Sequence, residues 1–403
     1  MVVISEYFLS LNQWILRQKP FIMKFVGLRL TKNKKVHFWE DILFMTENLD
    51  NQEQGMKHDI SNKKLCIDDR VSENIQFLGV IMTCFMVFYH CGDYGNPESI
   101  GLNKFLNDVF SSMGTYVMCH FFTITGFLLF YNLSFKNIYS KIRRRVSSLL
   151  IPYIAWQTII AIMISCLSRT LMNPKEFLVK TFGCVQWPLD GALWYCYAVF
   201  IIALFSPVLL WLFKNKKTAF VITIILVIGI EARTFITASL FVNIVNYGYL
   251  PNILFYLPCY LVGAYIGKFC KELEIVDVTK SVFIIAFAAF VLQSVFTGFF
   301  ANTVIKLLPI VSIFVISKVP QLGKMKILYH LTFLMYAIHQ PVIGEFKWRI
   351  DAIIGKCSIP VSVQNLLARI IILAIDVLIS YSIFALLHKH FPRGIKVLTG
   401  GRG

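Results

Sequence analysis

Residues 75–90 read IQFLGVIMTCFMVFYH, and this stretch decides the fold class. It carries no charge from Ile75 to Tyr89, and its length approaches the roughly 20 apolar residues that a helix needs to cross a bilayer. An ionisable side chain is costly to place in hydrocarbon, so His90 at the end of this stretch is a candidate functional residue. The alternative interpretation is a histidine at a helix end, wetted by the membrane interface.

The whole chain repeats this apolar pattern. Of its 403 residues 57% are hydrophobic and only 15% are charged, whereas a soluble domain carries about 25% charged residues. The sequence predicts an all-α, polytopic integral membrane protein with about ten transmembrane helices. The ten predicted spans are 75–91, 109–131, 146–166, 193–213, 218–231, 253–270, 281–297, 303–318, 328–346 and 366–388.

Lysine and arginine set the expected orientation. If residue 74 is cytoplasmic, the later inner segments carry 18 Lys and Arg and the outer segments carry 8. Positive residues favour the cytoplasmic side, so both termini are expected in the cytoplasm. The net charge of +17 is spread between apolar segments rather than over one face, which argues against nucleic-acid binding and for contact with the lipid bilayer.

Three regions follow from this pattern. Residues 1–74 form a polar and basic N-terminal extension, residues 75–388 the membrane domain, and residues 389–403 a cytoplasmic tail. The extension is either an interfacial amphipathic segment or, in part, untranslated sequence ahead of a start at Met56. No CxxC pair and no histidine–carboxylate spacing suited to a metal occurs, so we expect no metal site.

Five short motifs occur in a fixed order along the predicted spans. They are FLG followed by ten residues and His90, FFTITGFL at 121–128, RRRVSSLLIPY at 143–153 with Trp156 after it, LWY at 193–195, and YAIHQP at 336–341. Together they resemble the membrane acyltransferase-3 family, bacterial enzymes that O-acylate sugars of cell-surface polysaccharides. The resemblance covers about residues 75–388 and implies a location in the bacterial inner membrane.

One position departs from the family pattern. The family places an arginine eleven residues before the histidine, and this chain has Gly79 there. Eleven residues advance a helix by about 16 Å and return to nearly the same face. The resemblance thus implies an anion-binding arginine towards the cytoplasm. The triplet Arg143, Arg144 and Arg145 is the candidate substitute for binding acyl-CoA, and topology determination is its alternative role.

Further candidates come from depth in the membrane. In the predicted orientation His339, Trp194, Glu231 and Lys306 reach the outer half of the bilayer with His90. Such a group suits a sugar, because aromatic faces stack on sugar rings and polar groups orient hydroxyls. Each has a simpler reading: Lys306 as a snorkelling side chain, Trp194 as part of the interfacial aromatic belt, and Glu231 as a loop residue.

His120 lies in the middle of the second predicted span. It either lines the path of the acyl thioester or makes an ordinary hydrogen bond between helices.

The resemblance implies transfer of an acyl group, acetyl being expected, from acetyl-CoA or another acyl-CoA to a sugar hydroxyl of a surface or lipid-linked glycan. His90 would act as general base, and His339 would orient the acceptor or assist the leaving thiol. Acyl-CoA is a co-substrate, and no permanently bound cofactor is expected. The competing reading is a non-catalytic relative that serves as a glycan transporter, flippase or assembly scaffold, and Gly79 favours it.

Overall fold

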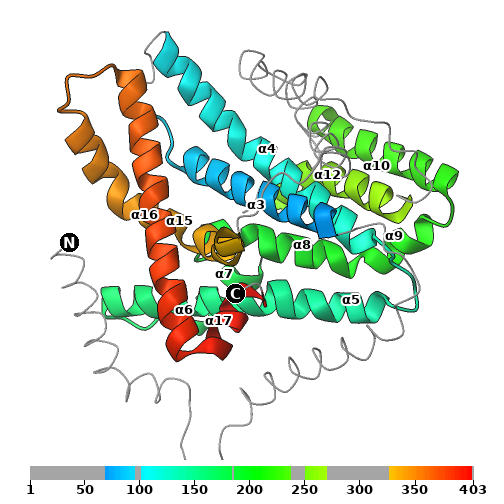
Figure 1. Cartoon of the computed structure of the whole chain (residues 1–403). Coiled ribbons are helices and arrows are strands. Elements are labelled where there is room, and N and C mark those ends of the chain that lie inside the picture. Colours follow the sequence, from blue (N-terminus) through cyan, green and yellow to red (C-terminus); the bar gives the residue numbers. More distant parts are fainter. Residues whose placement is uncertain (1–68, 96–100, 184–185, 237–249, 270–325, 402–403) are drawn as a thin grey trace, which may run out of the picture. The chain divides into compact units, whose positions relative to one another are not determined.

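The computed structural model of the chain describes residues 69–95, 101–183, 186–236, 250–269 and 326–401. All described elements are helices, and they lie in the compact unit Leu65–Gly403 (Figure 1). The all-α prediction is therefore confirmed for this part of the chain. The predicted extension 1–74 lies almost entirely outside the described residues.

The first helices are α3 (Asp69–His90) and α4 (Leu102–Phe130), which pack side by side (Figure 1). The chain continues through α5 (Ile138–Arg145), a single π turn η1 (Val146–Leu150) and α6 (Ile151–Ser168). Pro152 explains the π turn. A proline has no N–H to donate four residues back, and its ring clashes with that carbonyl, so the helix opens locally to accommodate it.

The remaining described helices complete the bundle. A short α7 (Pro174–Phe182) is followed by a 3₁₀ turn η2 (Gly191–Leu193), α8 (Trp194–Leu204) and α9 (Ser206–Leu212). Next come α10 (Lys216–Ile236), α12 (Leu250–Phe269), α15 (Lys326–Ile354), α16 (Val361–His390) and α17 (Pro392–Thr399).

Four described helical segments are long and apolar enough to cross a membrane: Val71–His90, Leu102–Phe130, Ile138–Ser168 and Val361–His390. A fifth is added if Gly191–Leu204 and Ser206–Leu212, which bend by 49° at their junction, form one broken span. The predicted count of about ten is not confirmed by this number. Two of the predicted spans, 281–297 and 303–318, lie outside the described residues.

The backbones of α4 and α12 approach each other closely. A Cβ atom on Gly263 would lie 2.0 Å from the carbonyl oxygen of Thr123, and one on Gly267 would lie 2.2 Å from that of Phe127. From the opposite helix, a Cβ on Gly126 would lie 2.3 Å from the Tyr260 carbonyl oxygen. Glycines four residues apart leave one helix face without side chains, which is the usual way for membrane helices to come this close.

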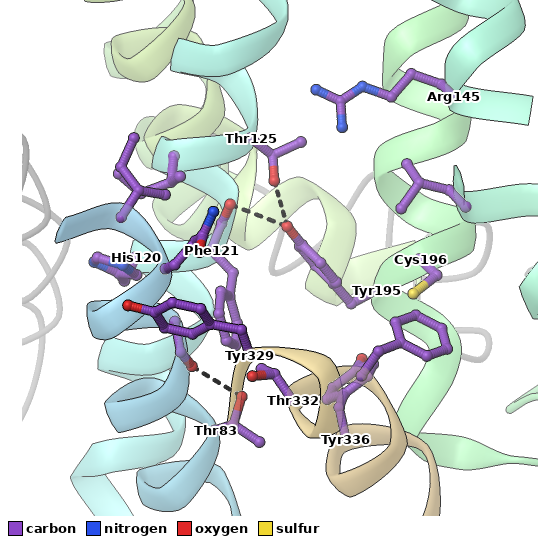
Figure 2. Close-up of a pocket in the computed structure, with 16 residues that line it drawn as sticks. Thr83, His120, Phe121, Thr125, Arg145, Tyr195, Cys196, Tyr329, Thr332 and Tyr336 are labelled. Atoms are coloured by element: carbon purple, nitrogen blue, oxygen red, sulfur yellow. Dashed lines mark hydrogen bonds between the residues drawn. The ribbon is translucent and has the colours of Figure 1, made fainter. Parts of the chain in front are cut away.

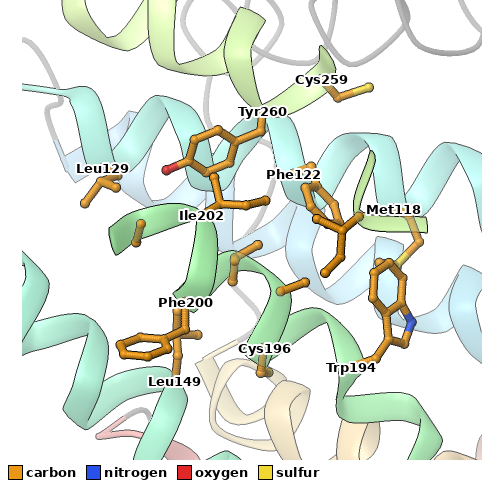
Figure 3. Packing of buried hydrophobic residues seen from close by; sticks show 14 of the residues in the cluster. Met118, Phe122, Leu129, Leu149, Trp194, Cys196, Phe200, Ile202, Cys259 and Tyr260 are labelled. Carbon is orange, nitrogen blue, oxygen red and sulfur yellow. The ribbon is translucent and has the colours of Figure 1, made fainter. Parts of the chain in front are cut away.

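Around this contact lies the main hydrophobic core, which α4, α8 and α12 share (Figure 3). The Phe122 ring stacks on Tyr256, with centroids 5.4 Å apart, and meets Tyr195 edge-on at 5.2 Å. Aromatic pairs in such geometries contribute about 0.5–1.5 kcal/mol beyond their buried area. The core therefore fixes α8 against α4, which places the LWY motif beside the FFTITGFL motif.

We expect Gly263→Ala to lower the thermal unfolding temperature of the detergent-purified protein. Its new methyl group must push the α4 backbone away, and overpacking of this kind costs about 1–3 kcal/mol. Gly344→Ala on α15 is the matched control, because a Cβ there meets nothing within 4 Å. Alanine favours a helix over glycine by about 1 kcal/mol, so the control should be equal to or above wild type in stability. Equal unfolding temperatures for the two variants would contradict the close approach.

Candidate functional site

One cavity, of about 360 Å³, contains both histidines of the sequence motifs; we call it the histidine cavity. Five helices (α3, α4, α8, α12 and α15) and the turn η2 line it. His90 comes from the end of α3 and His339 from the middle of α15. Its polar and aromatic lining residues are Tyr89, His90, Trp187, Trp194, Asn252, Tyr256, Tyr336, His339 and Gln340.

The two histidine rings lie next to each other, with centroids 4.9 Å apart and ring planes tilted by 44°. The Nδ1 atom of His339 lies 2.8 Å from the carbonyl oxygen of Tyr336. A carbonyl can only accept, so Nδ1 carries the hydrogen and, in a neutral ring, Nε2 keeps its lone pair. That Nε2 atom is buried and has no hydrogen-bond partner, so His339 holds a basic nitrogen ready for a bound hydroxyl.

A second cavity, of about 270 Å³, contains Arg145; we call it the arginine cavity. Among the described residues that line it, Arg145 is the one cation (Figure 2). Figure 2 shows its side chain extending towards Thr125 of α4. The Tyr195 hydroxyl donates to the carbonyl of Phe121 over 3.0 Å and lies 2.5 Å from the Thr125 hydroxyl. These bonds fix the wall opposite the arginine.

Tyr336 lines both cavities, so they adjoin at this residue. Its hydroxyl donates to the carbonyl of Ala192 in η2, which ties α15 to the turn before α8. The same residue also holds His339 through its own carbonyl. Tyr336 thus stands between a compartment with two histidines and a compartment with an arginine.

Gly79 lies in the wall of the arginine cavity. A Cβ at this position would meet nothing within 4 Å, so the glycine is not required by close packing. The missing arginine of the family pattern and Arg145 therefore belong to one compartment. Arg143 and Arg144 are not among the lining residues, and Arg144 is exposed.

The other sequence candidates fall in different places. Trp194 lines the histidine cavity and meets Trp187 edge-on, with centroids 6.3 Å apart. His120 lines the arginine cavity, where its Nδ1 atom is buried and has no hydrogen-bond partner. Glu231 lies in α10, but its side chain is outside the described part of the chain, and Lys306 is outside the described residues altogether.

Several residues at or next to the two cavities were not found from the sequence: Trp187 and Gln340 line the histidine cavity, and Asp190 directly precedes η2. Asp190 caps η2, because its carboxylate accepts from the Ala192 N–H over 3.1 Å. The side-chain amide of Gln157 accepts from the backbone N–H of Asp190 and donates to its backbone carbonyl. Burial raises the pKa of Asp190 to about 7. The Asp–Gly pair before LWY was a usable signal for a capped turn, and Gln340 lies within the YAIHQP motif, whereas Trp187 had no signal beyond its residue type.

Arg369 of α16 fixes the end of α3 that carries His90. Arg369 is 2% exposed, and its guanidinium donates to the carbonyl oxygens of Phe88 and Gly92, on either side of the histidine. Its Nε atom donates to Asn365 over 2.8 Å. A cation at a helix C-terminus also interacts favourably with the helix dipole. The position of His90 therefore depends on a residue far away in the sequence.

Arg369→Gln should lower the unfolding temperature of the purified protein clearly. Two partly buried carbonyl groups lose their charged donor, and an unsatisfied group costs up to about 1–3 kcal/mol when it is fully buried. The exposed Arg393→Gln removes the same charge from the surface and should change little. An unfolding temperature for Arg369→Gln equal to that of the control would contradict this role.

Comparison with known proteins identifies the family. No curated protein and no solved structure is similar enough to this chain to match it. The model of the acyltransferase-3 family, described as an acyltransferase domain, matches residues 73–385, a range that includes the lining residues of both cavities and all or most of every described helix except α17. The family, together with several apolar helices of membrane-spanning length, indicates a multi-pass membrane protein. This chain belongs to the acyltransferase-3 family of membrane acyltransferases.

Proposed function

We propose that this acyltransferase moves an acetyl group from acetyl-CoA to a sugar hydroxyl of a surface or lipid-linked glycan. The observation that carries the proposal is the pair of adjoining cavities, one with the cation suited to a phosphate and one with the bases suited to a hydroxyl. The proposal places the protein in the bacterial inner membrane with both termini in the cytoplasm. In that orientation the arginine cavity receives the donor from the cytoplasm.

The arginine cavity suits the thioester end of the donor. A guanidinium binds phosphate through several N–H groups in a fixed plane, and Arg145 presents one here. The rest of the lining is mainly apolar and aromatic, with hydroxyls from Thr83, Thr125 and Thr332. Such a lining favours a slim, weakly polar arm such as pantetheine, whose thiol end then points towards Tyr336.

The histidine cavity suits a sugar. Trp187, Trp194 and Tyr256 supply aromatic faces, and Gln340 and Asn252 supply amide groups that can donate to and accept from hydroxyls. Gln340 lies close to η2, because a Cβ on Gly191 would be 3.0 Å from its Oε1 atom. The combination of ring stacking and paired amide bonds orients one hydroxyl towards the histidines.

The chemistry follows from the two neutral histidines. The acceptor oxygen attacks the thioester carbonyl carbon while its proton passes to His90, and the C–S bond breaks. The sulfur leaves as a thiolate and takes a proton to give CoA, and the sugar carries the new ester. His339 accepts a hydrogen bond from a neighbouring hydroxyl through Nε2 and so orients the acceptor. A positioned base contributes about 10²–10⁴-fold to the rate.

One observation favours a second reading. Gly79 stands where the family pattern has an arginine, and a relative without catalysis would tolerate that loss. The chain would then move a glycan across the membrane or hold a polysaccharide-assembly complex together. Acyl transfer that depends on His90 separates the enzyme from both.

His90→Ala is expected to reduce O-acetylation of the surface polysaccharide by at least about 10²-fold, because the general base is lost. The measurement is the acetyl signal in proton NMR of polysaccharide from cells that carry no gene, the wild-type gene or the variant, at equal membrane abundance. His390→Ala, exposed at the end of α16, is the control and should acetylate like wild type. Equal acetyl content in all four strains would contradict O-acetylation of that glycan.

Arg145→Ala is expected to raise the KM for acetyl-CoA about tenfold or more while kcat at saturating donor changes less, since a charge-assisted bond to phosphate is lost. Arg144→Ala removes the same charge one residue away, on an exposed position outside the cavity, and should leave KM near wild type. Equal effects of the two substitutions would show that general positive charge, rather than the cavity, attracts the donor.

A further inference from the structure

The helix α17 packs against α6 (Figure 1), and the residue after it, Gly400, lies against Ser148 of the π turn that follows Arg145. Its inner face is fully covered: Ile395 is 1% exposed and Thr399 is 0% exposed. The indole Nε1 of Trp156 in α6 donates to the carbonyl oxygen of Leu398 over 3.1 Å. This short helix is therefore docked by packing and by a directed hydrogen bond rather than lying loosely on the surface.

After α17 the chain turns at Gly400 and touches the π turn. Gly400 has φ +64°, and a Cβ on it would lie 2.4 Å from the carbonyl oxygen of Ser148. The N–H of Gly401 donates back to the carbonyl of Lys396 over 2.8 Å, which closes the end of the helix. Only glycine fits position 400, because both its backbone conformation and the adjacent carbonyl exclude a side chain.

The carbonyl touched by Gly400 is the one that the α-helix cannot satisfy. In an α-helix the Ser148 carbonyl would accept from the N–H of residue 152, and residue 152 is a proline. The π turn η1 contains one extra residue, which lets the helix continue although Pro152 has no N–H for the Ser148 carbonyl. A π turn is an uncommon, locally strained geometry, and it persists where the surroundings hold it.

The π turn also sets the direction of Arg145. Arg145 immediately precedes η1, and Leu149 within η1 lines the arginine cavity with it. Removing the one extra residue of a π turn would rotate the preceding helix by about 100°. Such a rotation of α5 would take Arg145 out of the cavity and bring a neighbouring side chain towards it.

We propose that Gly400 and Trp156 are positioning residues for donor binding: by docking α17 they hold the π turn in the register that directs Arg145 into the arginine cavity. The inference rests on the proposed use of that cavity by acyl-CoA. It assigns to the C-terminal segment, which lies beyond the residues matched by the family model, a role in the affinity for the donor.

The test compares Gly400→Ala with Gly401→Ala in the full-length protein. Both glycines have positive φ, +64° and +78°, so alanine carries similar backbone strain at each. A Cβ on Gly401 meets nothing within 4 Å, so Gly401→Ala lacks the clash with Ser148. We expect Gly400→Ala to raise the dissociation constant for acetyl-CoA about tenfold, measured by calorimetry on purified protein, and Gly401→Ala to leave it within about twofold of wild type.

A double-mutant cycle with Arg145→Ala separates positioning from general destabilisation. If Gly400 acts through Arg145, Gly400→Ala adds little to the weakened binding of Arg145→Ala. Trp156→Phe keeps an aromatic ring but removes the N–H that donates to the Leu398 carbonyl, so it should weaken acetyl-CoA binding in the same non-additive way. This variant replaces Gly400→Ala in the cycle if Gly400→Ala does not fold.

The outcomes are distinct. Equal dissociation constants for Gly400→Ala and Gly401→Ala, or full additivity with Arg145→Ala, would overturn the positioning role while the donor site stands. A wild-type protein that does not bind acetyl-CoA would overturn the proposed function itself, and this inference with it.

Discussion

The direct backbone contact between α4 and α12 is the constraint on which the rest of the structure depends. Gly126, Gly263 and Gly267 let the two helices meet without side chains between them. In a bilayer there is little hydrophobic gain from bringing helices together, so close van der Waals packing has to supply the association. Because α4 lines both cavities and α12 lines the histidine cavity, this contact sets the width of the site.

The second organising feature is that the arginine and the two histidines lie in different cavities. Arg145 stands in one compartment, the two histidines in the other, and Tyr336 between them. A cation beside the histidines would disfavour the proton that a general base has to take up. In the proposed reaction, Arg145 binds the phosphate of the donor on the other side of Tyr336 and so avoids that cost, while the two cavities still share Tyr336 as a lining residue.

Much of this arrangement was predictable from the sequence, because the short motifs mark the elements that meet. The FFTITGFL, LWY and YAIHQP segments each contribute lining residues, and His90 and His339 were expected near one another. The four-residue spacing of Gly263 and Gly267 is typical of closely packed membrane helices, but we drew no prediction from it, and it does not identify the partner helix. Placing both helices around one core needed the aromatic contacts of Phe122, which join residues far apart in the chain.

Other features depend on tertiary contacts that no local pattern encodes. In the sequence, Arg369 is only a charged residue within the last predicted span. Its role in holding the end of α3 follows from its hydrogen bonds to the carbonyl oxygens of Phe88 and Gly92. The choice of Arg145 within the arginine triplet depends on the phase that the π turn imposes, since neighbours on a helix point about 100° apart. The number of spans, the orientation, and the roles of Glu231 and Lys306 stay predictions.

The most direct test of the two-compartment account is to supply acetyl-CoA labelled in its acetyl group to membranes that contain the full chain and the host glycan. The account predicts label in the glycan fraction, released by mild base as expected for an ester. It also predicts loss of that label with Tyr336→Trp, whose larger ring narrows the junction, while acetyl-CoA binding persists. Unchanged transfer in that variant, or an unlabelled glycan with the wild-type protein, would contradict the account.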